Sequence, residues 1–130
     1  MLTFAVLTTT CGSASSPEAS EPPATSVSQT DADTMIAGLC EMSVELGDDV
    51  VAARTVFYDD VHERLHRFAT KAEVIDTALA GALLEAKQLV EADLESAAVP
   101  TDYGGHLNRL LAVTQDAVVQ LGFGDPGCAG

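Results

Sequence analysis

The stretch VHERLHRF contains the pattern His-Glu-x-x-His, formed by His62, Glu63 and His66. In zinc peptidases this pattern places two histidine ligands and a catalytic glutamate on one helix. The longer peptidase pattern continues with a glycine and a third histidine at fixed positions. This chain has Ala69 and Ala72 at those two positions. A third protein ligand for zinc is therefore missing from the motif.

Helical geometry also argues against a peptidase. At about 100° per residue, one apolar stripe runs along the helix that would carry the motif. It consists of Phe57, Val61, Leu65 and Phe68. His62 and His66 lie on the flank of this stripe, and Glu63 lies nearly opposite the core. We therefore predict that the match is accidental and that the protein is not an enzyme.

Two other interpretations of the histidines remain. His62 and His66 are four residues apart, and Asp59 precedes them by one turn, so the three could chelate Zn, Cu or Ni. Otherwise, the histidines form a partly buried flank, hydrogen-bonded to carboxylates at a helix–helix seam. The same helix offers two acid–base pairs with the favoured spacing, Asp60–Arg64 and Glu63–Arg67. Apart from such a metal, no cofactor is predicted.

The charge balance excludes several kinds of partner. The chain of 130 residues has 6 Lys and Arg against 20 Asp and Glu, a formal net charge of −14. A nucleic-acid-binding protein needs a basic surface, and so does a protein held electrostatically on an anionic membrane. We therefore expect neither kind of binding. The length corresponds to a single domain.

The elements that must position these residues are helices. From residue 31 onward, apolar residues recur at intervals of three and four in four stretches. The expected breaks are Gly47 with a cap at Asp48 or Asp49, a cap at Thr70 or Asp76, and Pro100, and the last helix ends at Gly122. Four amphipathic helices with short connections predict an all-α domain over residues 31–130, an antiparallel up-down-up-down four-helix bundle.

A few polar residues have special positions in these helices. In the third, whose apolar face begins with Ile75, Lys87 and Glu91 are expected on the solvent side, whereas Asp93 falls on the apolar face. Asp93 either pairs with Arg109 of the last helix or reaches water at the helix end. Around Tyr103, glycines shape either a small pocket or a loosened first turn.

The beginning of the chain has a different composition. MLTFAVLTTTC is apolar and then hydroxylated, and residues 12–30 are rich in Ser, Thr, Ala and Pro, as in a disordered tether. This layout resembles that of bacterial lipoproteins, in which a cysteine after a short apolar segment is lipidated. The resemblance implies lipidation at Cys11 and export to the outer face of the cytoplasmic membrane or the periplasm. Residues 1–11 would be an incomplete signal segment, since the apolar run is short and lacks a preceding Lys or Arg.

The cysteines are consistent with export. If Cys11 carries lipid, Cys40 and Cys128 remain as an even pair that could form a disulfide; the alternative is two unrelated cysteines. No run of about 20 apolar residues exists, so attachment would be by lipid rather than by a transmembrane helix. The whole chain also resembles small helical exported proteins of bacteria. We predict a membrane-anchored, non-enzymatic lipoprotein that binds an unknown protein or small ligand; the alternative is an extracytoplasmic metal-binding protein using His62 and His66.

Overall fold

The computed structural model describes residues 26–128, and every regular element in that range is helical. The elements are α1 (Gln29–Cys40), η1 (Glu41–Glu45), α2 (Val50–Val56), η2 (Phe57–Val61), α3 (His62–Ile75), α4 (Thr77–Glu95) and α5 (Tyr103–Gln120). Because η1 continues α1, and η2 joins α2 to α3, these segments make four continuous helices. This confirms the all-helical prediction.

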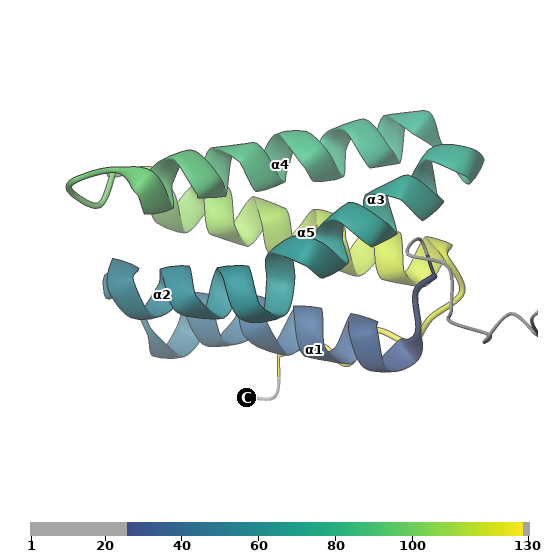
Figure 1. Cartoon of the computed structure of the whole chain (residues 1–130), viewed down its shortest axis with the longest axis horizontal. Helices are drawn as coiled ribbons and strands as arrows, with labels where there is room; N and C mark the ends of the chain where they lie inside the picture. Colours follow the sequence, from purple (N-terminus) through teal and green to yellow (C-terminus); the bar gives the residue numbers. More distant parts are fainter. Residues whose placement is uncertain (1–25, 129–130) are drawn as a thin grey trace, which may run out of the picture.

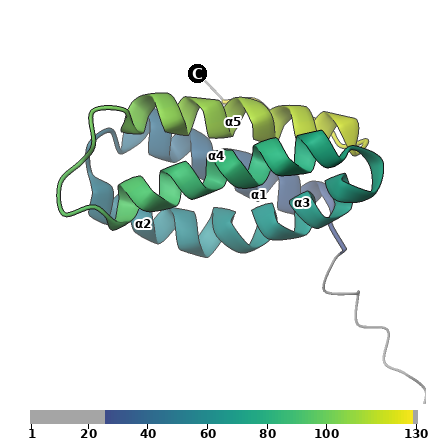
Figure 2. The ribbon, with the colours of Figure 1, turned by 90° about the horizontal axis from the view of Figure 1, so that it is seen from above.

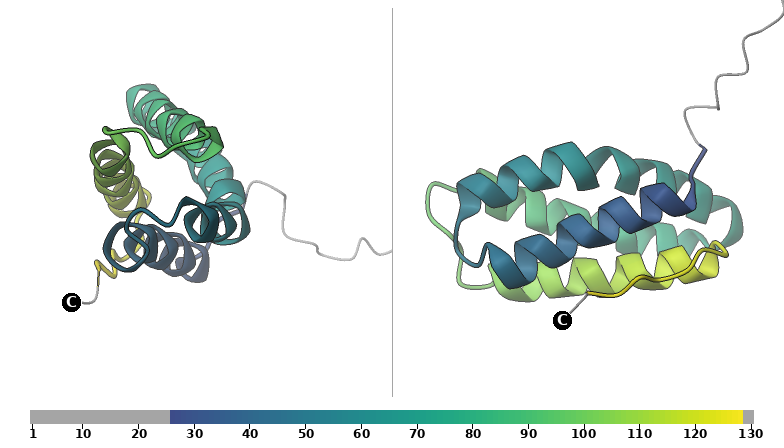
Figure 3. Two further views of the ribbon diagram at one scale, coloured as in Figure 1. Left: turned by 90° about the vertical axis from the view of Figure 1, so that its left-hand side faces the viewer. Right: turned by 90° about the horizontal axis from the view of Figure 1, so that it is seen from below.

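The four helices lie side by side along the long axis of the molecule (Figure 1). Seen end-on, they surround a common centre (Figure 3, left). From above, α4 lies between α5 and the α2–α3 helix (Figure 2), and α4 packs most extensively against α3 and α5. None of the helices within residues 26–128 has the length and apolar character needed to cross a lipid bilayer.

Side-chain caps fix where the helices begin. The hydroxyl of Ser28 accepts a hydrogen bond from the amide of Asp31, whose carboxylate accepts one from the amide of Ser28, which is a capping box. The carboxylate of Asp49 accepts from the amide of Ala52. Of the two positions that the sequence left open between the second and third helices, Asp76 is the cap, since its carboxylate accepts from two amides of α4.

The choice of Asp76 corrects the predicted register at this corner. The sequence placed Ile75 on the apolar face of the third helix, but it is the last residue of α3 and is 57% exposed. Its neighbour Val74 is 84% exposed. The cause is the extended backbone of Asp76, which separates α3 from α4 and turns these side chains outward.

Two π-helical turns were not predicted. In η1 the amide of Leu46 donates to the carbonyl oxygen of Glu41, and in η2 the amide of His62 donates to that of Phe57. Such a turn inserts one residue into a helix and shifts the register of the residues after it. Next to η2, α1 presents Gly38, where a Cβ atom would lie 2.9 Å from Cγ2 of Val61. The absence of a side chain at Gly38 therefore lets α1 approach η2 closely.

The core lies between the four helices. The stripe Phe57, Val61, Leu65 and Phe68 is fully buried, as predicted. It packs with side chains from the other helices, among them Met35, Leu39, Leu83, Val90, Leu110 and Val118. The core fixes α3 with one flank toward α1 and the other toward α4.

The tail after α5 turns back along the molecule (Figure 3, right). The ring of Phe123 lies 5.8 Å from that of Phe68. Gln29 and Gly124 exchange two hydrogen bonds of 2.8 and 2.9 Å. A disulfide between Cys128 and Cys40 joins the tail to α1, with 5.4 Å between their Cα atoms; it is the pairing expected if Cys11 carries lipid.

Candidate functional site

The motif VHERLHRF distributes its side chains in different directions around α3. Leu65 and Phe68 enter the core. His62 and His66 face the seam with α4, whereas Arg64 and Arg67 face α1. Glu63 is exposed, as helical geometry predicts. The motif therefore contributes to two separate polar sites on opposite flanks of one helix.

The first site, which we call the histidine seam, consists of His62, His66, Lys87 and Glu91. Nε2 of His62 lies 2.9 Å from Oε1 of Glu91, and Nζ of Lys87 lies 2.6 Å from the same oxygen. The two imidazole rings are 4.8 Å apart. Lys87 is only 4% exposed, so the solvent-facing position predicted for it is wrong. Its ammonium group meets Glu91, which lets the apolar stem of this long side chain be buried.

The electrostatics of this seam oppose a second positive charge. Loss of hydration lowers the pKa of His66 below its ordinary value of 6.5, and the charge of Lys87 and the proximity of His62 lower it further. Glu91 and Glu63 act in the opposite direction without cancelling this effect. His66 is therefore a neutral imidazole near pH 7.

The predicted metal ligands are only partly brought together. The carboxylate that contacts His62 is that of Glu91 from α4. Asp59, the predicted third ligand, meets Arg64 through its backbone carbonyl oxygen. In the range 26–128, no group of three or more His, Cys, Asp or Glu side chains is placed to hold a metal ion. What the structure provides is a histidine pair with one neighbouring carboxylate and a competing lysine.

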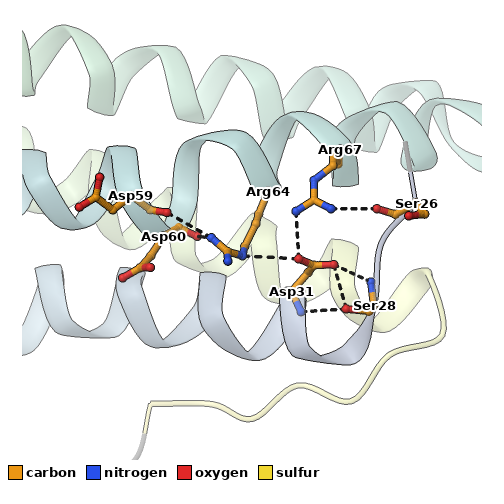
Figure 4. Close-up of polar contacts among 7 residues, drawn as sticks. All are labelled: Ser26, Ser28, Asp31, Asp59, Asp60, Arg64 and Arg67. Carbon is orange, nitrogen blue, oxygen red and sulfur yellow. Dashed lines mark hydrogen bonds and ion pairs between the residues drawn. The ribbon is translucent and has the colours of Figure 1, made fainter. Parts of the chain in front are cut away.

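The second site, the arginine seam, consists of Asp31, Arg64 and Arg67 (Figure 4). Oδ1 of Asp31 lies 2.9 Å from Nη2 of Arg67 and 3.5 Å from Nε of Arg64. Arg67 also donates to the carbonyl oxygen of Ser26 at 3.0 Å, which ties the first described residues to α3. All three charged side chains are about three-quarters or more buried.

These contacts replace the two predicted acid–base pairs along the helix. Arg64 donates to the backbone carbonyl oxygen of Asp60 at 2.9 Å, not to its carboxylate, and Arg67 pairs with Asp31 instead of Glu63. Both arginines gain more by meeting a partly buried carboxylate on another helix than by an exposed pair on their own.

The arginine seam determines the charge of Asp31. Burial raises the pKa of this carboxyl group, but hydrogen bonds from Ser28 and Arg67 and the positive charge of Arg67 outweigh burial. The pKa of Asp31 therefore lies below its ordinary value of 3.8. The carboxylate is charged at all physiological pH values.

A third polar group lies where α4 ends and α5 begins. Oδ2 of Asp93 is 2.7 Å from Nδ1 of His106, and the Asp93 side chain is only 8% exposed. The sequence proposed Arg109 as the partner of Asp93, but Arg109 pairs with Glu85 at 3.5 Å. His106, three residues earlier in α5, takes its place.

A cavity of about 290 Å³ lies at the same end, and Tyr103 and Asp48 are among its lining residues. The small pocket that was one of two alternatives there is therefore present. The buried hydroxyl of Tyr103 has no hydrogen-bond partner among the described residues. Burial, Asp93 and Asp48 all raise the pKa of Tyr103 above its ordinary value of 10.0.

Three partners of the motif were not predicted from the sequence, because they lie on other helices. They are Asp31, which meets the arginines, and Lys87 and Glu91 in the histidine seam. Lys87 and Glu91 have the i,i+4 spacing of an ion pair on one helix, a signal that could have found their mutual contact. Nothing local indicates that they meet His62. Cys11, the predicted lipidation site, lies outside the described residues.

No protein family, curated protein or solved structure matches this chain.

Proposed function

We propose that this chain is an exported, lipid-anchored and non-enzymatic protein whose acidic helical domain binds a partner. The disulfide between Cys40 and Cys128 is the main support. Disulfides form and persist in oxidising compartments and are rare in the reducing cytosol. With these two cysteines paired, Cys11 is left for the lipid that the lipoprotein-like beginning implies. The protein would be held at the outer face of the cytoplasmic membrane or in the periplasm.

The architecture of the domain is inferred to be an antiparallel, up-down-up-down four-helix bundle. Its support comes from the short connections, of which the one between α3 and α4 is the single residue Asp76. So tight a connection favours antiparallel neighbours. The extensive packing of α4 on both α3 and α5 is consistent with this topology.

A non-catalytic role is favoured by the state of the polar groups. Glu63, the acid that a peptidase would use, is exposed and forms none of the contacts of the histidine seam. Glu91 is already shared by His62 and Lys87. Catalytic groups need free positions next to a substrate, so these side chains are better suited to holding two helices together.

Lipidation can be tested in cells that produce the protein naturally. The cells are fed an alkyne fatty acid, and the protein is isolated and analysed by mass spectrometry. We expect the label on Cys11, recovery in the membrane fraction, and no label after Cys11→Ser. The matched variant Cys128→Ser should keep the label. Unlabelled wild-type protein in the soluble cytosolic fraction would contradict the proposal.

The disulfide has a measurable effect on stability. It joins residues 88 positions apart, so its loss should lower the free energy of unfolding by about 2–4 kcal/mol. Urea denaturation of the double variant Cys40→Ser/Cys128→Ser, compared with wild-type protein before and after reduction, measures this change. If Cys40 and Cys128 of the isolated wild-type protein react with an alkylating reagent without prior reduction, they are free thiols. This result would remove the main support for export.

Transition-metal binding is the second candidate function. The observation that favours it is the histidine pair, with rings 4.8 Å apart and a carboxylate on His62. Calorimetric titration of the full chain with Zn, Cu and Ni tests it, beside the variants His62→Ala/His66→Ala and His106→Ala. Tight one-to-one binding that only the double variant abolishes would establish the site. Binding that survives in the double variant would exclude the pair as ligands.

A further inference from the structure

A groove of about 450 Å³ runs between the first helix and the C-terminal tail. We call it the tail groove. Ala37 in α1 and Val44 in η1 contribute apolar surface from the helix, Pro126 lies on the tail side, and the Cys40–Cys128 disulfide links the two sides. The remaining helical lining includes three acids, Asp33, Glu41 and Glu45. The groove thus combines an apolar surface with a purely acidic rim.

The acids of the rim are not neutralised by the protein. Among the described residues, Asp33, Glu41 and Glu45 form no ion pair. Five of the six lysines and arginines of the chain pair with acids elsewhere: Arg54, Arg64, Arg67, Lys87 and Arg109. The sixth, Lys71, is not part of the groove lining. The negative potential of the rim is therefore available to a partner of opposite charge.

The spacing of the acids distinguishes between possible cations. Asp33, Glu41 and Glu45 all line the groove, and the first and the last are twelve positions apart, which corresponds to about 18 Å along a helix axis. A metal ion needs its ligands around one point, and within residues 26–128 no such group of three acids exists. A row of separated charges instead matches an elongated partner with several cationic side chains.

The apolar surface adds a second requirement. Val44 is 73% exposed although it lines the groove together with Pro126 and the disulfide. A partner that covers Val44 would bury apolar surface while its charged side chains reach the rim. An amphipathic helix meets both requirements, since its apolar and cationic residues lie on adjacent faces.

We propose that the tail groove is the docking site for a basic amphipathic helix of a partner protein. This inference rests on the proposed binding function and identifies its site and the chemistry of its partner. A second copy of the chain is not the occupant, because the groove is acidic and the chain has a net charge of −14. Binding also depends on the disulfide, because reduction frees the end of the tail that forms one wall.

The experiment uses the full chain with Cys11→Ser. The probe is a fluorescein-labelled amphipathic peptide built from Lys, Leu and Ala, and its length of about 12 residues matches the row of acids. Fluorescence anisotropy at about 150 mM salt, where long-range charge effects are screened, measures its affinity. Glu41→Gln/Glu45→Gln should weaken binding about tenfold, because two charge pairs are lost. Val44→Gln, which leaves the charge unchanged, should weaken binding several-fold. Reduction of the disulfide should also weaken binding.

The matched control is Glu63→Gln/Glu73→Gln, which removes two exposed acids outside the groove and should leave the affinity within about twofold. Equal losses in both double variants would overturn the proposal, because binding would then follow net charge alone. Absence of peptide binding would also overturn the proposal. So would calorimetric binding of Ca²⁺ that is abolished in Glu41→Gln/Glu45→Gln. Either result leaves the fatty-acid labelling of Cys11 unaffected, so failure of this inference is distinguishable from failure of the proposed export.

Discussion

The two flanks of α3 carry polar seams of similar size but different chemistry. Toward α1, Arg64 and Arg67 surround the carboxylate of Asp31. Toward α4, His62 and Lys87 share the carboxylate of Glu91, with His66 beside them. In each seam one carboxylate lies between two basic side chains. Both come from VHERLHRF in the arginine seam, whereas the histidine seam combines His62 of this motif with Lys87 of α4.

The seams differ in how their charge responds to pH. Arginine stays protonated at every accessible pH, and the pKa of Asp31 lies below 3.8, so the arginine seam has one charge state near neutrality. The pKa of His66 lies below its ordinary value of 6.5, so the histidine seam can gain a proton only as the pH falls below neutrality. We infer that the arginine seam is a permanent structural contact, whereas the histidine seam is a weaker contact whose strength depends on conditions.

Of the two seams, the arginine seam should show the larger effect on stability. Asp31→Ala removes the anion between two mostly buried arginines and also the capping box of α1, so the free energy of unfolding should fall by about 2–3 kcal/mol. Urea denaturation measures the change. Asp33→Ala, in which only an exposed hydrogen bond from Gln29 is lost, should change it by less than about 0.5 kcal/mol. Similar losses in the two variants would mean that the arginine seam contributes nothing beyond an exposed helical acid.

A smaller effect is expected from Lys87→Met in the histidine seam. The methionine keeps most of the buried volume and removes a charge that is costly to bury, so stability should change by less than about 1 kcal/mol. The pKa of His66 should rise toward 6.5, because the charge of Lys87 is one of the causes that lower it. Titration of the imidazole proton signals by NMR measures this shift. An unchanged pKa of His66 would show that the lysine does not act on the seam.

Most of the helical fold was predictable from the sequence, because apolar spacing depends on residues that are close along the chain. Phe57, Val61, Leu65 and Phe68 are all buried as predicted. The caps were harder, since Thr70 and Asp76 both fit the local rule and only the packing of α4 selects Asp76. The π-helical turns have no signature in the apolar spacing, and the close approach of α1 to η2 at Gly38 likewise involves residues far apart along the chain.

The polar sites were less predictable for a related reason. Sequence spacing suggests partners on the same helix, and so Asp60 and Glu63 were assigned to the arginines. In the folded chain the partner of both is Asp31, which lies 33 residues before Arg64. Such pairs depend on which helices become neighbours and at what register. Predicting them would require the relative rotation of α1 and α3, which the sequence pattern leaves free.

The smallest expected effect concerns the pH response of the histidine seam. Because the pKa of His66 is lower in the folded chain than its ordinary value of 6.5, the unfolded chain takes up this proton first as the pH falls. The contribution of neutral His66 to stability is thus complete above pH 6.5 and is lost as the pH falls from there through the folded pKa. Denaturation midpoints between pH 7 and pH 5 should therefore fall less in His66→Gln than in wild-type protein. In the Lys87→Met background the same substitution should matter less, because the folded and unfolded pKa values of His66 are then closer. If His66→Gln has the same effect in both backgrounds, the pH response comes from elsewhere, and the contrast between the two flanks of α3 would be one of geometry alone.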